Sequence, residues 1–160
     1  MSSKGKESRN ASGVLTTNRK AFRDFHVLEK IEAGIELCGT EVKSIREGHV
    51  RIDEAYVQAE NGHAEVLQMT VQPYSHGNLF NHISDRPRRL LMHKKEILRL
   101  QSKISEKGLT LIPLRVYLKN GRVKIEVALC KGKNVVDKRE TLKKKTADME
   151  ARRAMSARYR

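Results

Sequence analysis

Hydrophobic and polar residues alternate along residues 25–38, which is typical of a strand with one buried face. The period then changes, because Val42 and Ile45 lie three residues apart, as on one face of a helix. Thr40 can cap the N-terminus of this helix, and Gly48 can end it. A helix of about two turns is not stable alone, so we expect it to pack on the sheet, where it could plug the open end of a barrel.

Two Asn-Gly pairs, Asn61-Gly62 and Asn120-Gly121, each separate two strand-like segments. This pair is the strongest short signal for a hairpin, because both turn positions need a positive φ. Pro113 lies inside the strand that precedes the second pair. Proline cannot donate to a strand ladder, and the inward phase shifts at this residue, so we expect a bulge there.

Residues 73–89 are loop-like, and residues 93–107 predict a helix, with Ile97, Leu100 and Ile104 at steps of three and four. Alternation alone indicates a mostly β, antiparallel protein. The two hairpins and the long first strand favour a small closed antiparallel barrel similar to the oligonucleotide-binding class, with about three short or medium helices outside it.

The chain divides into three segments. Residues 1–17 are rich in Ser, Gly and Asn and are expected to form a disordered basic arm. Residues 18–130 hold the predicted β-barrel, and residues 131–160 form a basic C-terminal tail with eleven basic and four acidic side chains. The tail has many helix-forming residues but no wide apolar stripe. We therefore expect it to be disordered when free and helical on a polyanionic partner.

The chain of 160 residues carries a formal net charge of +14, which indicates a polyanionic partner, most commonly nucleic acid. An anionic membrane surface is the alternative, but a helix that binds one carries Trp, Phe or Leu opposite its charges. This chain has no Trp and only 4% aromatic residues. The scarcity of rings also favours recognition of a folded RNA by its backbone and shape over stacking on splayed bases.

No apolar run approaches the ~20 residues of a membrane span, and residues 1–13 lack the apolar segment of a secretory signal. We expect a cytoplasmic protein with no membrane partner. Cys38 and Cys130 lie far apart without the spacing of a metal site, and each ends an alternating pattern. Both are therefore expected to be buried, reduced thiols.

The sequence offers no recognisable catalytic motif. Its six histidines include no metal-ligand pair, no Ser or Cys lies in a nucleophile motif, and Lys131-Gly132-Lys133 is not a Walker loop. We expect no metal, no cofactor and no enzymatic activity. A metal-free ribonuclease built from His and Lys is the alternative, since such residues converge only in space.

Four blocks of sequence, in order, resemble the bacterial small protein B family. They are EAGIELCGTEVKSIREG from Glu32, LLMHKKEI from Leu90, KGLTLIPL from Lys107 and KGKNVVDKRET from Lys131, and the resemblance runs over residues 18–145. It implies an adaptor that binds transfer-messenger RNA in the rescue of stalled ribosomes. The implied further partners are the ribosome, at its small-subunit decoding region and messenger path, and a translation elongation GTPase.

In that family, the positions that match Asn18, Glu32 and Leu91 contact the RNA. A carboxylate accepts from a base amino group, as a cation cannot, although Glu32 could simply pair with a nearby Lys or Arg. Leu91 lies in an apolar run that by itself predicts core burial, so its exposure rests on the resemblance. Candidate phosphate contacts are Arg19, Lys20, Lys43, Arg46, Lys124, Lys133, Lys138 and Arg139.

The resemblance places the tail in the vacant messenger path, where it folds in place of codon pairing. The tail residues expected to contact the ribosome are Asp137, Lys138, Arg139, Lys143, Lys144, Lys145, Arg152, Arg153 and Met155. The chain departs from the family pattern at Asn134 and Val136, where Lys and an aromatic ring are common. A ribosome-bound structural protein or factor with a basic extension is the alternative reading of the same residues.

Overall fold

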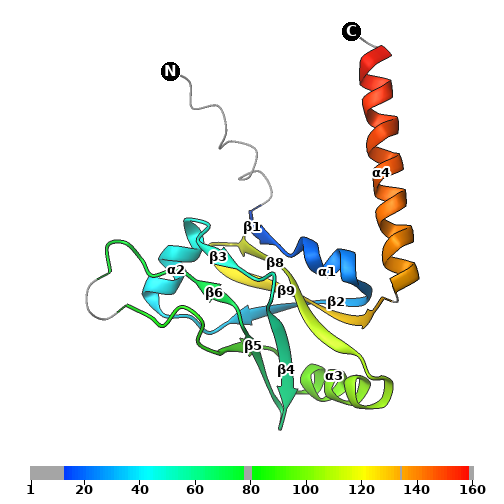
Figure 1. Cartoon of the computed structure of the whole chain (residues 1–160). Coiled ribbons are helices and arrows are strands. Elements are labelled where there is room, and N and C mark those ends of the chain that lie inside the picture. Colours follow the sequence, from blue (N-terminus) through cyan, green and yellow to red (C-terminus); the bar gives the residue numbers. More distant parts are fainter. Residues whose placement is uncertain (1–12, 78–80, 134, 159–160) are drawn as a thin grey trace, which may run out of the picture.

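The computed structural model describes residues 13–77, 81–133 and 135–158, within which nine strands and four helices are defined (Figure 1). The strands are β1 (Val14–Thr17), β2 (Phe25–Ile35), β3 (Val50–Arg51), β4 (Tyr56–Glu60), β5 (His63–Leu67), β6 (Thr70–Val71), β7 (Arg88–Leu91), β8 (Thr110–Lys119) and β9 (Arg122–Gly132). The helices are α1 (Arg19–Asp24), α2 (Gly39–Arg46), α3 (Lys94–Lys107) and α4 (Val135–Arg158).

Seven of the strands form one antiparallel sheet in the order β1-β8-β4-β5-β7-β2-β9. Because β8 also pairs with β9, six strands close into a ring of hydrogen-bonded neighbours, and β1 is added to it at β8. The remaining two strands, β3 and β6, pair separately. The expectation of a mostly β, antiparallel fold is confirmed, and the described residues hold three helices, α1 to α3, besides the tail helix α4.

Both hairpin turns lie where the Asn-Gly pairs predicted them. Asn61 and Gly62 join β4 to β5 with φ of 51° and 74°, and Asn120 and Gly121 join β8 to β9 with φ of 52° and 75°. The register between β8 and β9 shifts after Pro113, which confirms the expected bulge. These local signals therefore fixed the connections of four of the ring strands.

The core lies inside the ring, and the apolar sides of α2 and α3 pack against it. Ile97 and Leu100 of α3 are 5% and 1% exposed, and Ile45 of α2 is fully buried in the same cluster. The predicted helix after the first strand thus packs on the sheet, as its short length required. A second, smaller cluster around Ala21 lies under α1.

The alternation of β2 breaks at Glu29, and the structure gives the reason. The register of β2 against β9 shifts between Val27 and Glu29. The Glu29 carboxylate pairs with Arg99 at 2.7 Å and with Lys103 at 2.9 Å, both on α3. Their hydrogen bonds, that of Arg99 foremost, lower the pKa of Glu29 to about 2. The charged residue therefore ties the ring to α3.

The N-terminal part adds a helix and corrects one expectation. Residues 19–24 form α1, because the Asn18 side chain caps this helix by accepting from the Ala21 N–H at 2.9 Å. Residues 14–17 form β1, which pairs with β8, although they were expected to belong to a disordered arm. Residues 1–12 of that arm lie outside the described residues.

The first strand ends at Ile35, and the N-cap of α2 is Cys38, where Thr40 was expected. The reason is Glu41, whose carboxylate accepts from the Cys38 N–H at 2.8 Å and so satisfies a free donor at the helix start. Cys38 is consequently exposed, against expectation, while Cys130 is buried as expected. Burial raises the pKa of the Cys130 thiol to about 11.

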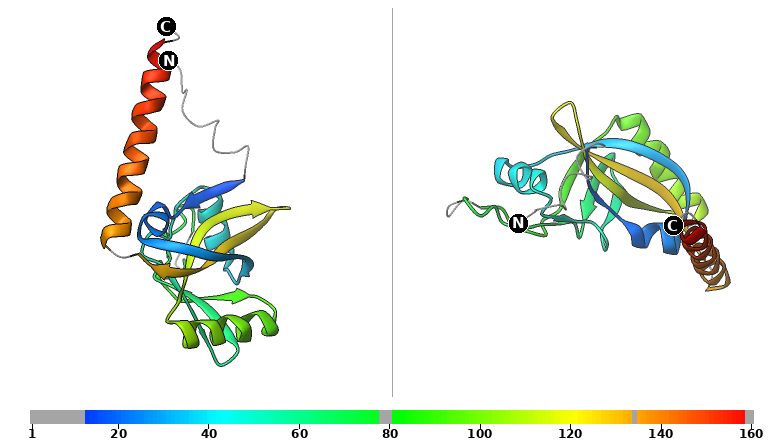
Figure 2. Two further views of the ribbon diagram at one scale, coloured as in Figure 1. Left: turned by 90° about the vertical axis from the view of Figure 1, so that its right-hand side faces the viewer. Right: turned by 90° about the horizontal axis from the view of Figure 1, so that it is seen from above.

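The tail forms α4, one of the two conformations expected for it, and projects from the ring next to α1 (Figures 1 and 2). With 24 residues it is roughly 36 Å long at a rise of about 1.5 Å per residue. Its first turns contact α1, where Lys138 lies 3.9 Å from Asp24. The Lys133 amine, just before the helix, donates to the Phe22 carbonyl at 3.3 Å and to the Thr141 hydroxyl at 3.1 Å.

Candidate nucleic-acid interface

One outer face of the ring, across β7, β2, β9 and β8, gathers several of the residues expected to bind RNA. Strand register places Leu91 opposite Gly34, Gly34 opposite Lys124, and Lys124 opposite Tyr117. Glu32 lies two residues before Gly34 and therefore on the same side of β2. We call these five residues the outer face.

Gly34 forms the floor of a groove next to Leu91. The groove has a volume of about 320 Å³ and is bounded by Val42 of α2 and by the turn at Gly121. A Cβ on Gly34 would lie 3.2 Å from the Cβ of Leu91, so the absence of a side chain lets Leu91 lie close against β2. Leu91 is 56% exposed, so the apolar run that contains it does not bury it.

Glu32 does pair with neighbouring side chains, yet it stays at the surface. Its carboxylate accepts from the Tyr117 hydroxyl, and the Lys119 amine lies 3.2 Å from one of its oxygens and 3.3 Å from the other. The hydrogen bond from Tyr117 is the main cause of a lowered pKa for Glu32, followed by that from Lys119, with Lys124 adding its charge. The side chain remains 39% exposed, so an ionised acceptor is accessible from outside.

Further cations lie on the strands beside Glu32, where two of them pair with the neighbouring carboxylate of Glu126. Lys30 and Arg115 lie 3.6 Å and 3.7 Å from the two oxygens of Glu126, and Lys119 is 56% exposed. Partly exposed ion pairs of this kind contribute little to stability, so their cations are available to a phosphate group. The outer face thus combines a fixed acceptor with donors that suit an RNA backbone.

Helix α2 carries two further candidates, of which Arg46 reaches the edge of the groove. The Arg46 guanidinium donates to the Gly121 carbonyl at 2.9 Å, which joins α2 to the β8–β9 turn. The Lys43 amine lies 5.5 Å from the centre of the Tyr74 ring, within range of a cation–π contact. Both cations are exposed, so α2 adds positive charge beside the groove.

A buried ion-pair network holds α2 in this place. The Glu41 carboxylate accepts from Arg88 at 2.8 Å and from Arg86 at 2.9 Å and 2.7 Å. Glu41 and Arg88 are both fully buried. Arg88 also donates to four backbone carbonyls, those of Met69, Ile83, Ser84 and Arg86. The guanidinium therefore connects α2 to residues 69 and 83–86.

Burial is the largest single influence on the pKa of Glu41 and acts to raise it. The hydrogen bonds from Arg86 and the Cys38 N–H, together with the charge of Arg88, outweigh it and leave this pKa below its ordinary value of 4.5. Sequence reasoning missed the network. It assigned residues 73–89 to a loop, whereas Arg88 begins β7.

Asn18, expected to contact RNA, is 1% exposed. Its amide donates to the Ile52 carbonyl at 3.0 Å and to the Pro113 carbonyl at 3.1 Å, and its oxygen accepts from Ala21. These bonds join the start of α1 to β8 and to the segment after β3. In this conformation its side chain has no surface to offer a ligand, so its contribution is to position α1.

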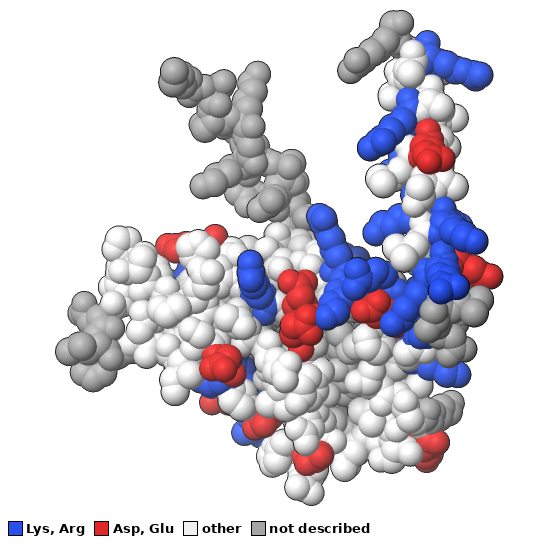
Figure 3. All heavy atoms as spheres, viewed as in Figure 1, with Lys and Arg blue, Asp and Glu red and all other residues white. Residues whose placement is uncertain are grey.

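The other candidates near α1 form a second basic region with the start of α4. Arg19 is exposed, and Lys20 pairs with Glu54 at 2.5 Å. Lys133 and Lys138 line a cavity of about 380 Å³ together with Asp24, whose pKa is lowered chiefly by its hydrogen bond from Arg23. Lys and Arg side chains gather where α1 meets the foot of α4 (Figure 3).

The two groups of candidates lie toward opposite ends of β2. The outer face is at the Gly34 end, and the second basic region is at the Phe25 end, nine residues away. At about 3.3 Å per residue, this separation is roughly 30 Å along the strand. The candidate phosphate contacts predicted from the sequence as one set therefore lie in two separate regions of the fold.

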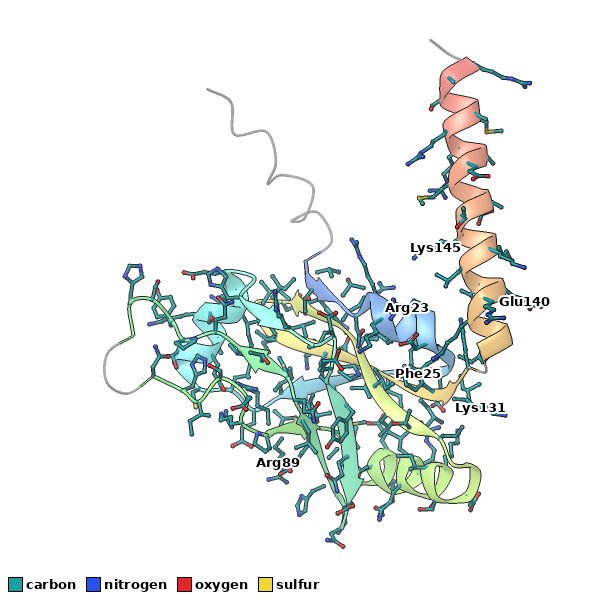
Figure 4. All side chains as sticks on the ribbon, viewed as in Figure 1. Arg23, Phe25, Arg89, Lys131, Glu140 and Lys145 are labelled. Carbon is teal, nitrogen blue, oxygen red and sulfur yellow. The ribbon has the colours of Figure 1, made fainter. Side chains whose placement is uncertain are left out.

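The described tail residues expected to contact the ribosome lie on α4. Lys145 is on the side of the helix that faces Arg23, and Glu140 is on the opposite side (Figure 4). The exposed members of the set are Arg139, Lys143, Lys144, Lys145, Arg152, Arg153 and Met155. The side chain of Asp137, also in that set, lies outside the described residues. Lys138 is partly buried against α1.

Within residues 13–77, 81–133 and 135–158, no three His, Cys, Asp or Glu side chains gather as a metal site. In the same part of the chain, no helix has the length and apolar character needed to cross a membrane.

Comparison with known proteins gives consistent matches over most of the chain. The family model described as "SmpB protein" matches residues 15–157. A protein named SsrA-binding protein from Carboxydothermus hydrogenoformans is 52% identical over 146 residues, which cover 91% of this chain and 98% of that protein. Another of the same name, from Caldicellulosiruptor saccharolyticus, is 50% identical over 142 residues, 89% of this chain and 90% of that protein.

A solved structure gives the same match in three dimensions. It is described as "tmRNA-SmpB: a journey to the center of the bacterial ribosome", and its matching chain is 40% identical to this one. The TM-score is 0.64, and the match covers 78% of this chain and 87% of the other.

Proposed function

This chain belongs to the SmpB protein family, and from this premise we propose that it is an RNA-binding adaptor that delivers transfer-messenger RNA to stalled ribosomes. It binds the tRNA-like domain of that RNA and takes part in trans-translation in the cytoplasm. A translation elongation GTPase accompanies the delivered complex. The protein itself carries out no covalent chemistry.

The observation that carries this proposal is the composition of the outer face. An ionised carboxylate at Glu32 lies next to the exposed Leu91 and the groove over Gly34, with Lys119 and Lys124 beside it. Cations neutralise phosphates without regard to sequence, whereas a carboxylate accepts only from a donor and so selects a base edge. Such a surface suits one shaped RNA better than polyanions in general.

The six-stranded ring supports a barrel of the oligonucleotide-binding type as the RNA-binding domain, over residues 18–130. Aromatic side chains make up only 4% of the chain, so the barrel reads the folded RNA through shape and phosphate contacts. Lys43 and Arg46 on α2 extend this contact from the edge of the groove. Arg19, Lys20, Lys133 and Lys138 supply a second region for the RNA or the ribosome.

The basic tail supplies the ribosome contact. On α4, eight Lys and Arg accompany four Asp and Glu, and the apolar residues Leu142, Met149 and Met155 are 48%, 54% and 68% exposed. A helix with so little apolar surface to bury is stabilised by an anionic partner rather than by the ring. The messenger path of a stalled ribosome, lined with RNA, is such a partner.

The proposal is tested by measuring affinity for the tRNA-like part of transfer-messenger RNA, with an unrelated structured RNA of equal length as the competitor. With about six to ten phosphate contacts, affinity should fall roughly 10³- to 10⁵-fold between 50 and 200 mM salt. Glu32→Gln should reduce the preference for the specific RNA, while Glu60→Gln, a change at an exposed carboxylate on β4, should not.

Equal affinity for the two RNAs would contradict the proposal. Purification from cells gives a second test. A single tRNA-like RNA that co-purifies in stoichiometric amount supports the adaptor. Recovery of whole ribosomal subunits alone would instead indicate a structural ribosomal protein.

A further inference from the structure

We propose that Tyr117 is a positioning residue that fixes the Glu32 carboxylate so that one oxygen is presented to an N–H donor on the edge of a nucleobase. This inference rests on the proposed function and adds a residue that no expectation from the sequence included. It also names the chemical group on the RNA that the outer face selects, which is a base amino or imino group and not a phosphate.

The Tyr117 side chain reaches across one whole strand to meet Glu32. Tyr117 lies on β8, where its register partner is Lys124 of β9. Glu32 lies on β2, beyond β9, and its register partner is Glu126. Two strand spacings amount to roughly 9.6 Å, which only a long side chain can cross. The Tyr117 ring therefore spans β9, and its hydroxyl donates to one oxygen of Glu32.

The Glu32 carboxylate keeps one acceptor position open. The oxygen bonded to Tyr117 also receives Lys119 at 3.3 Å, and the other oxygen receives Lys119 at 3.2 Å. An ionised carboxylate has about four acceptor positions, so the second oxygen keeps a position open. Since 39% of the side chain is exposed, a ligand can reach it.

Tyr117 restricts the orientation of the Glu32 carboxylate more than Lys119 does. The Lys119 side chain is 56% exposed and rotates about four bonds, so its amine follows the carboxylate. The phenol ring turns about only two bonds and lies across β9, which limits where its hydroxyl can be. Without that hydroxyl, the carboxylate would turn with Lys119 and lose its fixed direction.

The charges around Glu32 favour a base edge over a phosphate. Lys119 and Lys124 face it from β8 and β9, while Glu126 is occupied by Lys30 and Arg115. Phosphates bind such cations and are repelled by a carboxylate. A nucleotide whose phosphates lie on the lysines presents its base to Glu32, where only an N–H donor forms a hydrogen bond.

A double-mutant cycle tests the inference with the full-length protein and the tRNA-like part of transfer-messenger RNA. Tyr117→Phe keeps the ring and removes the hydroxyl, and we expect it to weaken binding roughly three- to tenfold, in line with the loss of one oriented hydrogen bond. The slope of affinity against salt should not change, because no phosphate contact is lost. In a protein that already carries Glu32→Gln, Tyr117→Phe should change affinity by less than about twofold.

Tyr56→Phe is the matched control, since Tyr56 is an exposed tyrosine on β4 that lines the second basic region and not the outer face, and any effect it has on affinity should be the same with Glu32 as with Glu32→Gln. The inference is overturned if Tyr117→Phe binds as well as the wild-type protein. It is also overturned if the effects of the two substitutions multiply, because Tyr117 would then act without Glu32. Thermal unfolding of each variant verifies that the fold is retained.

A measurement without RNA separates this inference from the proposed function. In the free protein, the pKa of the Glu32 carboxyl followed by NMR should rise toward its ordinary value of 4.5 when Tyr117 becomes Phe. An unchanged pKa would show that the hydroxyl does not hold the carboxylate and would refute the positioning role. Failure of the wild-type protein to bind the RNA would instead refute the proposed function, and the NMR comparison would still decide the role of Tyr117.

Discussion

Replacing Arg88 by Met should destabilise the protein by about 3–5 kcal/mol, because it removes one partner of a buried ion pair and leaves the other charge in place. The guanidinium and the Glu41 carboxylate are both fully buried. Arg88 makes five hydrogen bonds, one to Glu41 and four to backbone carbonyls. Met fills similar space but donates a hydrogen bond to none of these acceptors. The expected loss is a sizeable part of the free energy of unfolding of an ordinary domain.

The adjacent residue provides the control for this prediction. Arg89 is on the same strand but exposed, and its guanidinium lies 3.3 Å from the Nδ1 atom of His63. Arg89→Met should change the free energy of unfolding by less than about 0.5 kcal/mol. Urea denaturation at pH 7 measures both variants, and Arg88→Met should lower the midpoint without changing the slope. If the two variants lost equal stability, the network would not hold α2.

The same variant has a predicted pH dependence. Since the pKa of Glu41 is lowered in the folded protein, its ionised form contributes stability that is fully present above the ordinary value of 4.5. This contribution is lost as the pH falls through the lower folded-state pKa. Without Arg88 the folded-state pKa of Glu41 moves up, so acid should cost Arg88→Met less stability than it costs the wild type, and the difference in the free energy of unfolding between the two proteins should shrink as the pH falls below 4.5.

Three further predictions concern other parts of the fold. Gly34→Ala places a methyl group 3.2 Å from the Cβ of Leu91, so it should lower the free energy of unfolding by about 1–3 kcal/mol in thermal denaturation and weaken RNA binding. Glu29→Gln should destabilise by about 0.5–1 kcal/mol at pH 7, after allowance for solvent screening, and the difference should shrink below pH 4.5 and vanish near the folded-state pKa of about 2. A thiol reagent should modify Cys38 in the folded protein and Cys130 only on unfolding, because Cys130 is buried with a pKa of about 11. Mass spectrometry measures the extent of modification at each cysteine. Equal rates of modification for both would contradict the structure.

The parts of the fold that short-range chemistry determines could be predicted from the sequence. The Asn-Gly turns, the bulge at Pro113 and the helix ending at Gly108, whose φ is 59°, each follow from the backbone preferences of one or two residues. Such signals do not depend on what the rest of the chain does.

Features that depend on distant contacts were not accessible in the same way. Helix α1 is short and is capped by Asn18, whose amide bonds to carbonyls 34 and 95 residues away. Arg88 is buried only because Glu41, 47 residues earlier, meets it. Charged residues in a loop-like stretch normally predict exposure, so neither partner revealed the pair.

Some of the RNA-binding residues could likewise be predicted from the sequence, and others depend on distant contacts. Composition indicated a polyanion, and the resemblance supplied Glu32 and Leu91, which the fold brings to one face. Tyr117 could not be found from the sequence, since its contact with Glu32 crosses an intervening strand. Asn18 could not be recognised as buried, because a polar residue next to basic ones is ordinarily at the surface.

The most direct test of the division of labour between ring and tail is the affinity for the tRNA-like RNA before and after truncation of the chain after Lys131. If the outer face holds the RNA, the truncated protein should bind within about threefold of the full chain, with only a small change in salt slope. If the charge of the tail held the RNA instead, truncation would remove most of the affinity and much of the salt dependence. That result would contradict the account.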